Sequence, residues 1–480
     1  MHVHLIGVCG TGMGPFAGLL KQAGHRVTGS DAAFLPPMGD ALVRWGIETL
    51  QGFDPAHLEP APDLVVVGNV CRPSNPEARA AIERGLRYAS FPASLRSMFL
   101  EQRRSFVVAG THGKTTTSAL LAYLLDAAGR QPGFLIGGIP ADFPESFRAG
   151  APGAAFVVEG DEYDSAFFEK TPKFWQYAPK VAVITSIEHD HVDIYPDLAS
   201  YRAAFAQFVE RLPADGLLVA NAAHAEVRAL AQGAPCRVSY YALQGQDTGG
   251  LDPLWLGAPC RPEPAAQPLD LFFGGSACGR VLSPLAGTHN AANALASIAM
   301  AVEGAGVAVR EVTRALPGFS GVKRRQELRG IADGVRVYDD FAHHPTAVHE
   351  TLRALRGRHP DGTLFAVFEP RSSTAARRLH ETEYGSAFAA ADVVLLAPVG
   401  RAEIPEAERL DVARVAAEIR STGRRAETPG SIDAIALRIT ELAVAGDTVV
   451  VMSNGAFGQL HDKLLAGLAA RAARTRLASG

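Results

Sequence analysis

Residues 109–117, AGTHGKTTT, have the composition of a loop that binds the phosphates of a nucleotide. Small residues let backbone N–H groups curl around phosphate oxygens, a lysine reaches the β- and γ-phosphates, and a hydroxyl binds Mg²⁺. Lys114 and Thr115 are placed for the last two functions. We expect a strand before the loop and a helix from Thr115 to Ala128 after it, whose N-terminus adds partial positive charge. The loop residues predicted to bind nucleotide are Gly110, Thr111, His112, Gly113, Lys114, Thr115 and Thr116.

This loop departs from the strict pattern GxxxxGK[ST], which would place glycine where Val108 stands. A glycine-rich turn that only caps a helix is the alternative interpretation. The order of strand, loop, Lys–Thr pair and helix favours phosphate binding. As a lysine of a surface loop, Lys114 is expected to contribute little to packing, so that Lys114→Ala would leave the fold intact.

Carboxylates follow two further apolar runs. Glu159 ends the run AAFVVE, and Asp190 and His191 follow KVAVITSIEH. Oxygen ligands at strand ends suit the Mg²⁺ that accompanies a nucleoside triphosphate. Taken singly, Glu162 and Asp164 are better interpreted as parts of a solvated acidic loop.

Three segments of the chain each alternate strand-like apolar runs with helix-like stretches, which is typical of parallel α/β domains. We predict an α/β protein of three domains: a Rossmann-like N-terminal domain over 1–102, a P-loop-type central ATPase domain over 103–321 and a Rossmann-like C-terminal domain over 322–480. The sequence PGFSG at 317–321 breaks the helical pattern and marks the second boundary. Polar residues follow many of the strands, where open α/β sheets bind ligands.

The composition excludes several classes of partner. The 480 residues carry a formal net charge of −4, which gives no reason to expect a nucleic acid or an anionic membrane. Five scattered cysteines form no CxxC pair, which disfavours disulfides or a zinc site and favours a reducing cytoplasm. No Lys or Arg precedes the first apolar run, so we expect a buried strand rather than a signal peptide, and no segment that spans a bilayer.

The GT-x-GKTT form of the phosphate loop resembles that of the Mur ligase family, and the resemblance extends over all three segments. It implies an ATP-dependent ligase that activates a carboxylate as an acyl phosphate and joins it to an amine. ATP would be the co-substrate and Mg²⁺ the cofactor, with two ions expected. The resemblance assigns Thr115, Glu159 and His191 to the metal ions and Lys114 to charge stabilisation. It leaves the general base open, with His191 as one candidate.

The stretch HNAAN at 289–293 resembles the sequence with which this family binds adenine, and it assigns Asn290 and Asn293 to the base. An asparagine side chain offers a donor and an acceptor together, which suits the edge of adenine. Helix capping is an equally good interpretation of Asn290.

Beyond the expected hinge, Arg324 or Arg325 could reach the γ-phosphate when the domains close, as similar arginines of the family do. A solvated charge cluster is the alternative. The sequence DDFAHHPT at 339–346 resembles the form found in ligases that act on muramate. The resemblance assigns Asp340 to the ribose of ATP and His343 or His344 to phosphates.

A glycine-rich turn follows the first strand, but Pro15 occupies the last glycine place of GxGxxG, so the turn is weak evidence for NAD. The muramate-type ligases use this turn for the diphosphate of a UDP-sugar. Capping of the strand end is the alternative interpretation of Asn69, in place of a contact with the nucleotide. The residues assigned to UDP-N-acetylmuramate are Gly10, Thr11, Gly12, Met13, Ser30, Asp31 and Asn69.

Two kinds of family member share this N-terminal form: one adds L-alanine, and the other adds the tripeptide L-Ala–γ-D-Glu–meso-diaminopimelate. The sequences GVCGTGMG, EGDEYDSAFF and FEPRSST favour the tripeptide, and the alanine-adding ligase is the alternative. A charged peptide needs a basic pocket, for which Arg371, Ser453 and Asn454 are the candidates, although an ion pair within the domain could equally explain Arg371. The expected partners are these small molecules, and the expected state is a monomer or a weak homodimer.

Overall fold

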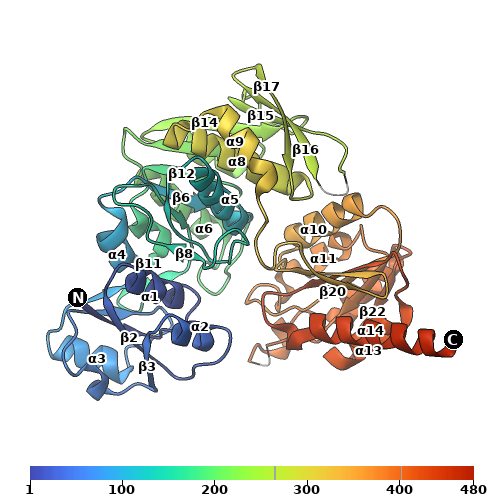
Figure 1. The fold of residues 1–480 in the computed structure, drawn as a ribbon, viewed down its shortest axis with the longest axis horizontal. Coiled ribbons are helices and arrows are strands. Elements are labelled where there is room, and N and C mark those ends of the chain that lie inside the picture. The colour runs from blue at the N-terminus through green and yellow to red at the C-terminus, as the bar shows by residue number, and fades with distance from the viewer. Residues whose placement is uncertain (264–265, 402, 480) are drawn as a thin grey trace.

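The computed structural model describes residues 1–263, 266–401 and 403–479. The predicted α/β class is confirmed, with a separate sheet in each of the three segments. In Figure 1 the N-terminal segment (blue) lies below the central one (teal to yellow), and the C-terminal segment (orange to red) stands beside both. The predicted boundary at 102/103 falls between η2 and β6, and that at 321/322 falls between η5 and β18. Both boundaries stay predictions.

The N-terminal sheet has five parallel strands in the order β3-β2-β1-β4-β5, so the chain reverses its winding between β1 and β4. Its strands are β1 (His2–Ile6), β2 (Arg26–Asp31), β3 (Glu48–Gln51), β4 (Leu64–Val67) and β5 (Tyr88–Ser90). Its helices are α1 (Met13–Gln22), α2 (Met38–Arg44), α3 (Pro76–Glu83) and α4 (Phe91–Leu95).

The central sheet has ten strands in the order β17-β16-β15-β14-β13-β12-β6-β9-β7-β8, and all pairs from β15 to β7 are parallel. Its core strands are continuous apolar runs because helices cover both faces. Its strands are β6 (Ser105–Ala109), β7 (Gly133–Leu135), β8 (Phe147–Arg148), β9 (Phe156–Glu159), β12 (Val181–Ile184), β13 (Leu217–Asn221), β14 (Arg237–Leu243), β15 (Trp255–Pro259), β16 (Gln267–Phe273) and β17 (Ser276–Ser283). The pair β10 (Asp164–Ala166) and β11 (Glu169–Pro172) lies apart, and the helices are α5 (Lys114–Ala127), α6 (Leu198–Glu210), α7 (Ala225–Ala231), α8 (Thr288–Ala299) and α9 (Val309–Ala315).

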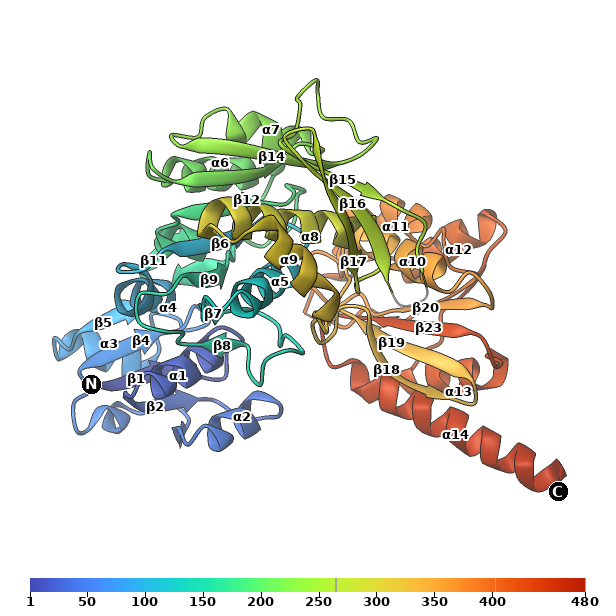
Figure 2. The same cartoon turned by 45° about the horizontal axis from the view of Figure 1, so that its top comes forward.

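The C-terminal sheet has six strands in the order β18-β19-β23-β20-β21-β22, and only the pair β18–β19 is antiparallel. Alternate residues of its strands pack on α10–α12 on one face and on α13 and α14 on the other. Its strands are β18 (Glu327–Ala332), β19 (Val335–Asp340), β20 (Leu364–Phe368), β21 (Val393–Leu396), β22 (Arg425–Glu427) and β23 (Thr448–Met452). Its helices are α10 (Pro345–Arg358), α11 (Glu381–Ala387), α12 (Val412–Ser421), α13 (Ile432–Leu442) and α14 (Leu460–Ser479), the last of which projects from the body in Figure 2.

Short 3₁₀ or π turns complete the order of elements: η1 (Pro55–Leu58), η2 (Arg96–Leu100), η3 (Lys173–Tyr177), η4 (Met300–Gly304), η5 (Leu316–Gly318), η6 (Arg378–His380), η7 (Glu406–Glu408) and η8 (Phe457–Gln459). Within the described ranges, no helix combines the length and the apolar character needed to cross a bilayer.

The N-terminal and central domains share one apolar core. A single buried cluster runs from α1 and the first sheet into β6, β9 and α6. At their contact Phe147 packs against Gly18 of α1, where a Cβ atom would lie 2.2 Å from the Phe147 ring, and its ring meets that of Trp45 at 5.0 Å. The C-terminal domain instead has its own two buried clusters, one on each face of its sheet.

Candidate functional site

A cavity of about 1010 Å³ opens where the three domains meet. Its walls combine the turn after β1, the phosphate loop, the loops after β9 and β12, the start of α8 and the segment after β19. The predicted site residues that line it are Gly10, Thr11, Gly12, Met13, Asn69, Thr111, His112, Gly113, Lys114, Thr115, Thr116, Glu159, His191, Asn290, Asn293, Arg325, Asp340 and His344. Residues distant in sequence are thus brought to one cavity.

The phosphate loop connects β6 to α5, and two of its glycines are required by its shape. Gly110 and Gly113 have φ angles of +127° and +80°, in the region that favours glycine. A Cβ atom at Gly110 would lie 2.1 Å from Thr185 Oγ1, and one at Gly113 would lie 2.3 Å from Asn293 Oδ1. The first N–H groups of α5 lack partners within the helix, and its first three residues line the cavity, where a phosphate can meet them.

The loop after β12 holds the phosphate loop in place. Ser186 accepts hydrogen bonds from the backbone N–H of Thr111, through its carbonyl at 2.9 Å, and from that of His112, through its hydroxyl at 3.1 Å. His112 Nε2 lies 3.0 Å from Glu188 Oε2. Ser186 therefore supports the phosphate loop through both its carbonyl and its hydroxyl.

Lys114 is anchored by a buried carboxylate. Its Nζ donates to Glu162 Oε1 at 2.8 Å and to the carbonyl of Gly110 at 2.6 Å. The Glu162 side chain is only 1% exposed, so its interpretation as part of a solvated loop was wrong. Burial lowers the pKa of Lys114, but the attraction of Glu162 outweighs this effect and raises it overall. Lys114 thus stays cationic, and its packing role was underestimated from sequence.

Glu159 lies at the end of β9, beside the start of α5. Thr115 Oγ1 donates to Glu159 Oε1 at 2.9 Å, and the backbone N–H of Gly137 donates to Oε2 at 2.8 Å. Burial raises the pKa of the Glu159 carboxyl above its usual range, although Lys114 opposes the shift. A half-buried carboxylate beside a hydroxyl at a helix N-terminus is an oxygen donor set that fits Mg²⁺. A divalent ion there would also offset the burial of the Glu159 charge.

Glu159→Gln is therefore expected to raise the Mg²⁺ concentration needed for half-maximal activity, because an amide oxygen lacks the charge of the carboxylate. Titrating activity with Mg²⁺ at saturating ATP measures the shift. An unchanged titration would move the metal site elsewhere, for example to Asp161.

His191 and Asp190 lie in the loop after β12 and also line the cavity. His191 has a φ of +55°, and its Nε2 lies 3.9 Å from Glu162 Oε2. Asp190 Oδ1 accepts from the backbone N–H of His191 at 2.7 Å and from the hydroxyl of Thr374 at 2.6 Å. Asp190 thus orients His191 and also connects the central domain to the C-terminal domain. The predicted metal role of His191 stays a prediction.

The two asparagines of α8 lie in the cavity wall at the phosphate loop. Asn290 Nδ2 donates to the carbonyl of Ala286 at 2.8 Å, and Asn293 Nδ2 donates to Asn290 Oδ1 at 3.2 Å. The helix N-cap is Gly287, with no side-chain cap, so Asn290 is not the capping residue. Both side chains are nearly buried, and their contact with adenine stays a prediction.

The segment after the hinge separates its two arginines. Arg325 lines the cavity, where its Nη2 donates to Thr115 Oγ1 at 3.1 Å and its guanidinium lies over the Phe341 ring. Arg324 lies outside the cavity lining and donates to the carbonyls of Ser453 and Gly455 at 2.6 and 2.7 Å. Of the two, only Arg325 is placed to reach a phosphate at Thr115.

Asp340 and the histidine pair lie next to that arginine. Asp340 accepts from the backbone N–H groups of Gln326 and Ala342, each at 2.8 Å, which orients its carboxylate at the cavity wall. His343 also lines the cavity, 4.0 Å from Asp190. His344 caps α10 by accepting from the backbone N–H of Thr346 at 3.3 Å.

Several predicted residues lie outside the cavity lining, namely Gly110, Ser30, Asp31, Arg324, Arg371, Ser453 and Asn454. The Ser30 hydroxyl donates to the buried carboxylate of Glu77, and Asp31 accepts from the backbone N–H of Cys9 at 2.8 Å. Both side chains therefore support the turn after β1 from behind.

The peptide candidates form a group beyond the carboxyl ends of the neighbouring strands β20 and β23. Arg371 Nη1 lies 3.8 Å from Glu369 Oε1 and stays half-exposed. Ser453 donates to the same carboxylate, and the side-chain oxygen of Asn454 is buried without a partner. Arg371 also passes close to Gly455, where a Cβ atom would lie 2.5 Å from its Cδ. The ion pair considered from sequence is present, and the exposed part of the guanidinium remains available to a ligand.

Sequence reasoning missed Glu188 and two threonines of the C-terminal domain, one of which bonds Glu188 and the other Asp190. Glu188 Oε2 accepts from the hydroxyl of Thr346 at 2.7 Å, and Thr374 bonds Asp190 as described. Glu188 stands two residues before Asp190 in the same loop after β12, so its position was a usable signal. The two threonines carried none, because an isolated threonine has no characteristic spacing.

Comparison with known proteins assigns this three-part architecture. Residues 2–103 match the family model described as "Mur ligase family, catalytic domain", residues 108–301 match "Mur ligase middle domain", and residues 324–455 match "Mur ligase, glutamate ligase domain". A protein of Escherichia coli K12 is 40% identical over 98% of this chain and 99% of its own length. The chain belongs to the Mur ligase family.

The named relatives of this Mur ligase include ligases for each of the two amine substrates, the tripeptide and L-alanine. The Escherichia coli protein, and one of Haemophilus influenzae that is 37% identical over 97% of this chain and 98% of its own, are named as UDP-N-acetylmuramate–L-alanyl-γ-D-glutamyl-meso-2,6-diaminoheptandioate ligases. A UDP-N-acetylmuramate–L-alanine ligase of Kineococcus radiotolerans is 40% identical over 83% of this chain and 81% of its own.

Among solved structures, a murein peptide ligase of Psychrobacter arcticus matches this Mur ligase with a TM-score of 0.70 and 34% identity. The match covers 98% of this chain and 99% of that protein. An alanine-adding ligase of Thermotoga maritima has a TM-score of 0.78 at 22% identity, with 97% and 98% covered, and that likeness shows the fold.

Proposed function

We propose that this Mur ligase joins the tripeptide L-Ala–γ-D-Glu–meso-diaminopimelate to UDP-N-acetylmuramate at the expense of ATP, in the recycling of peptidoglycan. The observation that carries the proposal is the likeness, over nearly the whole chain, to two proteins named for this reaction. Arg371 belongs to the C-terminal domain, which also supplies part of the cavity wall. Its half-exposed guanidinium supports the proposal that the amine substrate is charged. The alanine-adding reaction is the alternative.

The proposed chemistry uses the cavity in two steps. The γ-phosphoryl group of ATP passes to the lactyl carboxylate, which gives an acyl phosphate and ADP. The amine of the peptide then attacks the carbonyl carbon, loses a proton and expels phosphate. Lys114 and Arg325 would stabilise the charge on the transferring phosphoryl group, and His191 is the candidate acceptor of the amine proton. Thr115 and Glu159 would hold Mg²⁺, which neutralises phosphate charge when bound. Binding of a second ion is the alternative role of His191, because a metal-bound imidazole nitrogen cannot accept a proton.

Two regions of the cavity support distinct positions for the two nucleotides. Gly10, Thr11 and Asn69, on the N-terminal side, are the proposed contacts of the UDP-sugar. Asn290, Asn293 and Asp340, which also line the cavity, are those of ATP. The number of metal ions, the oligomeric state and a cytoplasmic location stay predictions from sequence.

A direct assay tests the acceptor. Purified enzyme with ATP, Mg²⁺ and UDP-N-acetylmuramate is offered L-alanine, the dipeptide or the tripeptide at equal concentration, and phosphate release is measured with product mass. We expect the tripeptide to react fastest. Faster ligation of L-alanine would overturn the proposed acceptor and leave the family unchanged.

Arg371→Ala is expected to weaken use of the tripeptide by about 1–3 kcal/mol in kcat/KM, the range for a lost charge-assisted hydrogen bond. The KM for UDP-N-acetylmuramate should stay within error, because its proposed contacts lie in another domain. Arg401→Ala is the matched control, since Arg401 is a half-exposed neighbour that bonds the carbonyl of Arg371 and Glu403. Equal losses in both variants would remove Arg371 from the peptide site.

A further inference from the structure

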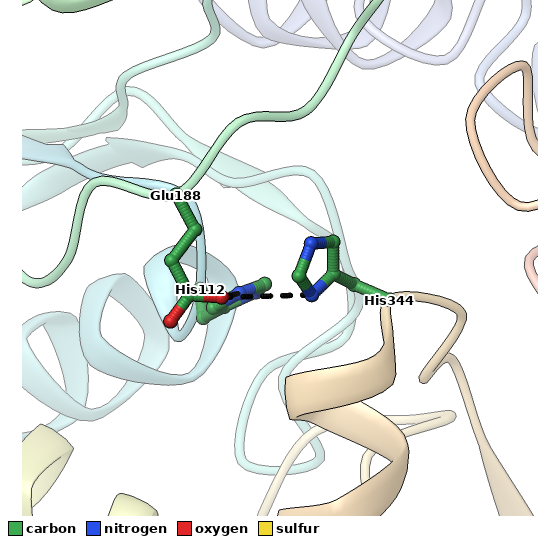
Figure 3. Close-up of side chains that lie close together, drawn as sticks. All are labelled: His112, Glu188 and His344. Atoms are coloured by element: carbon green, nitrogen blue, oxygen red, sulfur yellow. Dashed lines mark hydrogen bonds and ion pairs between the residues drawn. The ribbon is translucent and has the colours of Figure 1, made fainter. Parts of the chain in front are cut away.

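His112, Glu188 and His344 form a cluster where the central and C-terminal domains meet (Figure 3). His112 comes from the phosphate loop and Glu188 from the loop after β12, whereas His344 caps α10 of the C-terminal domain. His112 Nε2 lies 3.0 Å from Glu188 Oε2, and His344 Nδ1 lies 3.6 Å from the same oxygen. One potential ligand atom from each residue lies within 4.8 Å of the others.

These separations are close to those of a transition-metal site. Ligands about 2.1 Å from a tetrahedral zinc ion lie roughly 3.4 Å from one another, so small side-chain movements would bring all three onto one ion. Two imidazoles and a carboxylate are a donor set that Zn²⁺ accepts readily, whereas Mg²⁺ prefers oxygen ligands throughout.

The surroundings suit a bound cation. Burial, followed by the neighbouring His112, lowers the pKa of His344 to about 3, so its ring is neutral. Burial disfavours ionisation of Glu188, but hydrogen bonds led by that from His112 hold its pKa at about 2. The Thr346 hydroxyl orients Glu188, as partners of metal-binding carboxylates commonly do. His344 is nearly buried, and its Nδ1 is engaged by the 3.3 Å bond from the backbone N–H of Thr346, which an ion would replace. All three residues line the cavity, which provides an entry path.

We propose that His112, Glu188 and His344 bind a Zn²⁺-like ion, separate from the Mg²⁺ site at Thr115 and Glu159, which ties the C-terminal domain to the phosphate loop. Because its ligands come from both domains, the ion binds the closed arrangement and stabilises it by mass action. Substrates must enter between these domains, so the bound ion slows turnover. This inference goes beyond the proposed ligation and does not depend on which acceptor is used.

Calorimetric titration of the metal-stripped, tag-free protein with Zn²⁺ in excess Mg²⁺ tests the site. We expect one strong binding event in the wild type, and Kd values about tenfold or more weaker in His344→Gln and Glu188→Gln. His349→Gln is the matched control, since it removes another histidine of α10 that lies outside the cluster. Circular dichroism shows whether each variant is folded.

A thermal scan gives a second measurement that does not depend on activity. Zn²⁺ should raise the Tm of the wild type and of His349→Gln, and should raise that of the two cluster variants much less. The proposal is overturned if the wild type shows no strong Zn²⁺ event in excess Mg²⁺. It is equally overturned if folded Glu188→Gln and His344→Gln titrate like the wild type.

Discussion

Replacing Lys114 by methionine is expected to lower kcat by roughly 10²–10³-fold or more and also to destabilise the fold. The loss of activity follows from removing a fixed cation beside the transferring phosphoryl group. The loss of stability follows from Glu162, a carboxyl group that is 1% exposed and would lose its main partner. Breaking a buried ion pair from one side typically costs about 3–5 kcal/mol.

The double variant Lys114→Met/Glu162→Gln separates the two effects. We expect it to recover most of the free energy of unfolding, because the buried charge is gone, and to remain inactive. Lys180→Met serves as the control, since Lys180 pairs with the exposed Asp215 at the surface and should change stability by less than about 1 kcal/mol. Chemical denaturation and ligation rates are measured for all four proteins. If Lys114→Met is as stable as the wild type, the ion pair does not have the proposed role in stability. If Lys114→Met has normal turnover, the phosphate-loop assignment is wrong.

Arg325→Ala is expected to lower kcat by about 10³-fold or more, the scale on which arginines act on transferring phosphoryl groups. Its guanidinium already bonds Thr115 Oγ1 from across the hinge. Arg325→Lys should recover only part of the rate, because a lysine keeps the charge but loses the planar fork.

Arg324→Ala is the companion variant that tests the distinction between the neighbours. Arg324 bonds two carbonyls of the turn after β23, so its removal should cost roughly 1–3 kcal/mol of stability and change kcat less than Arg325→Ala does. Rates are compared at a temperature where both variants are folded. If Arg324→Ala lowers kcat more than Arg325→Ala does, Arg324 rather than Arg325 acts on the phosphoryl group.

Motifs whose residues lie close together in the chain were predictable from the sequence. The phosphate loop carries its strand, glycines, Lys114 and Thr115 within a few residues, and the helix predicted over 115–128 is α5 within one residue at each end. The alternating apolar runs likewise predicted three α/β segments, because continuous apolar strands require helices on both faces of a sheet.

Contacts between distant segments were not predictable in this way. The pairing of Lys114 with Glu162 depends on how β9 lies beside β6 in the sheet. The choice between Arg324 and Arg325 depends on which guanidinium meets Thr115 and which meets the turn after β23, since both lie near the Phe341 ring. Glu188 became recognisable only once Thr346 and His344 of the C-terminal domain faced it.

The shared core of the first two domains has a mechanical consequence. Phe147 interlocks with α1 at Gly18, and one continuous apolar cluster spans both domains, so sliding them apart would expose buried hydrocarbon. The C-terminal domain meets them chiefly through hydroxyl, carboxylate and guanidinium contacts, such as Thr374–Asp190 and Arg325–Thr115, which water can replace at small cost. We therefore expect the N-terminal and central domains to move as one rigid unit and the C-terminal domain to move relative to them. The walls proposed for the sugar nucleotide and the ATP phosphates then keep their mutual alignment, while Arg325 and the peptide candidates approach and leave the cavity together.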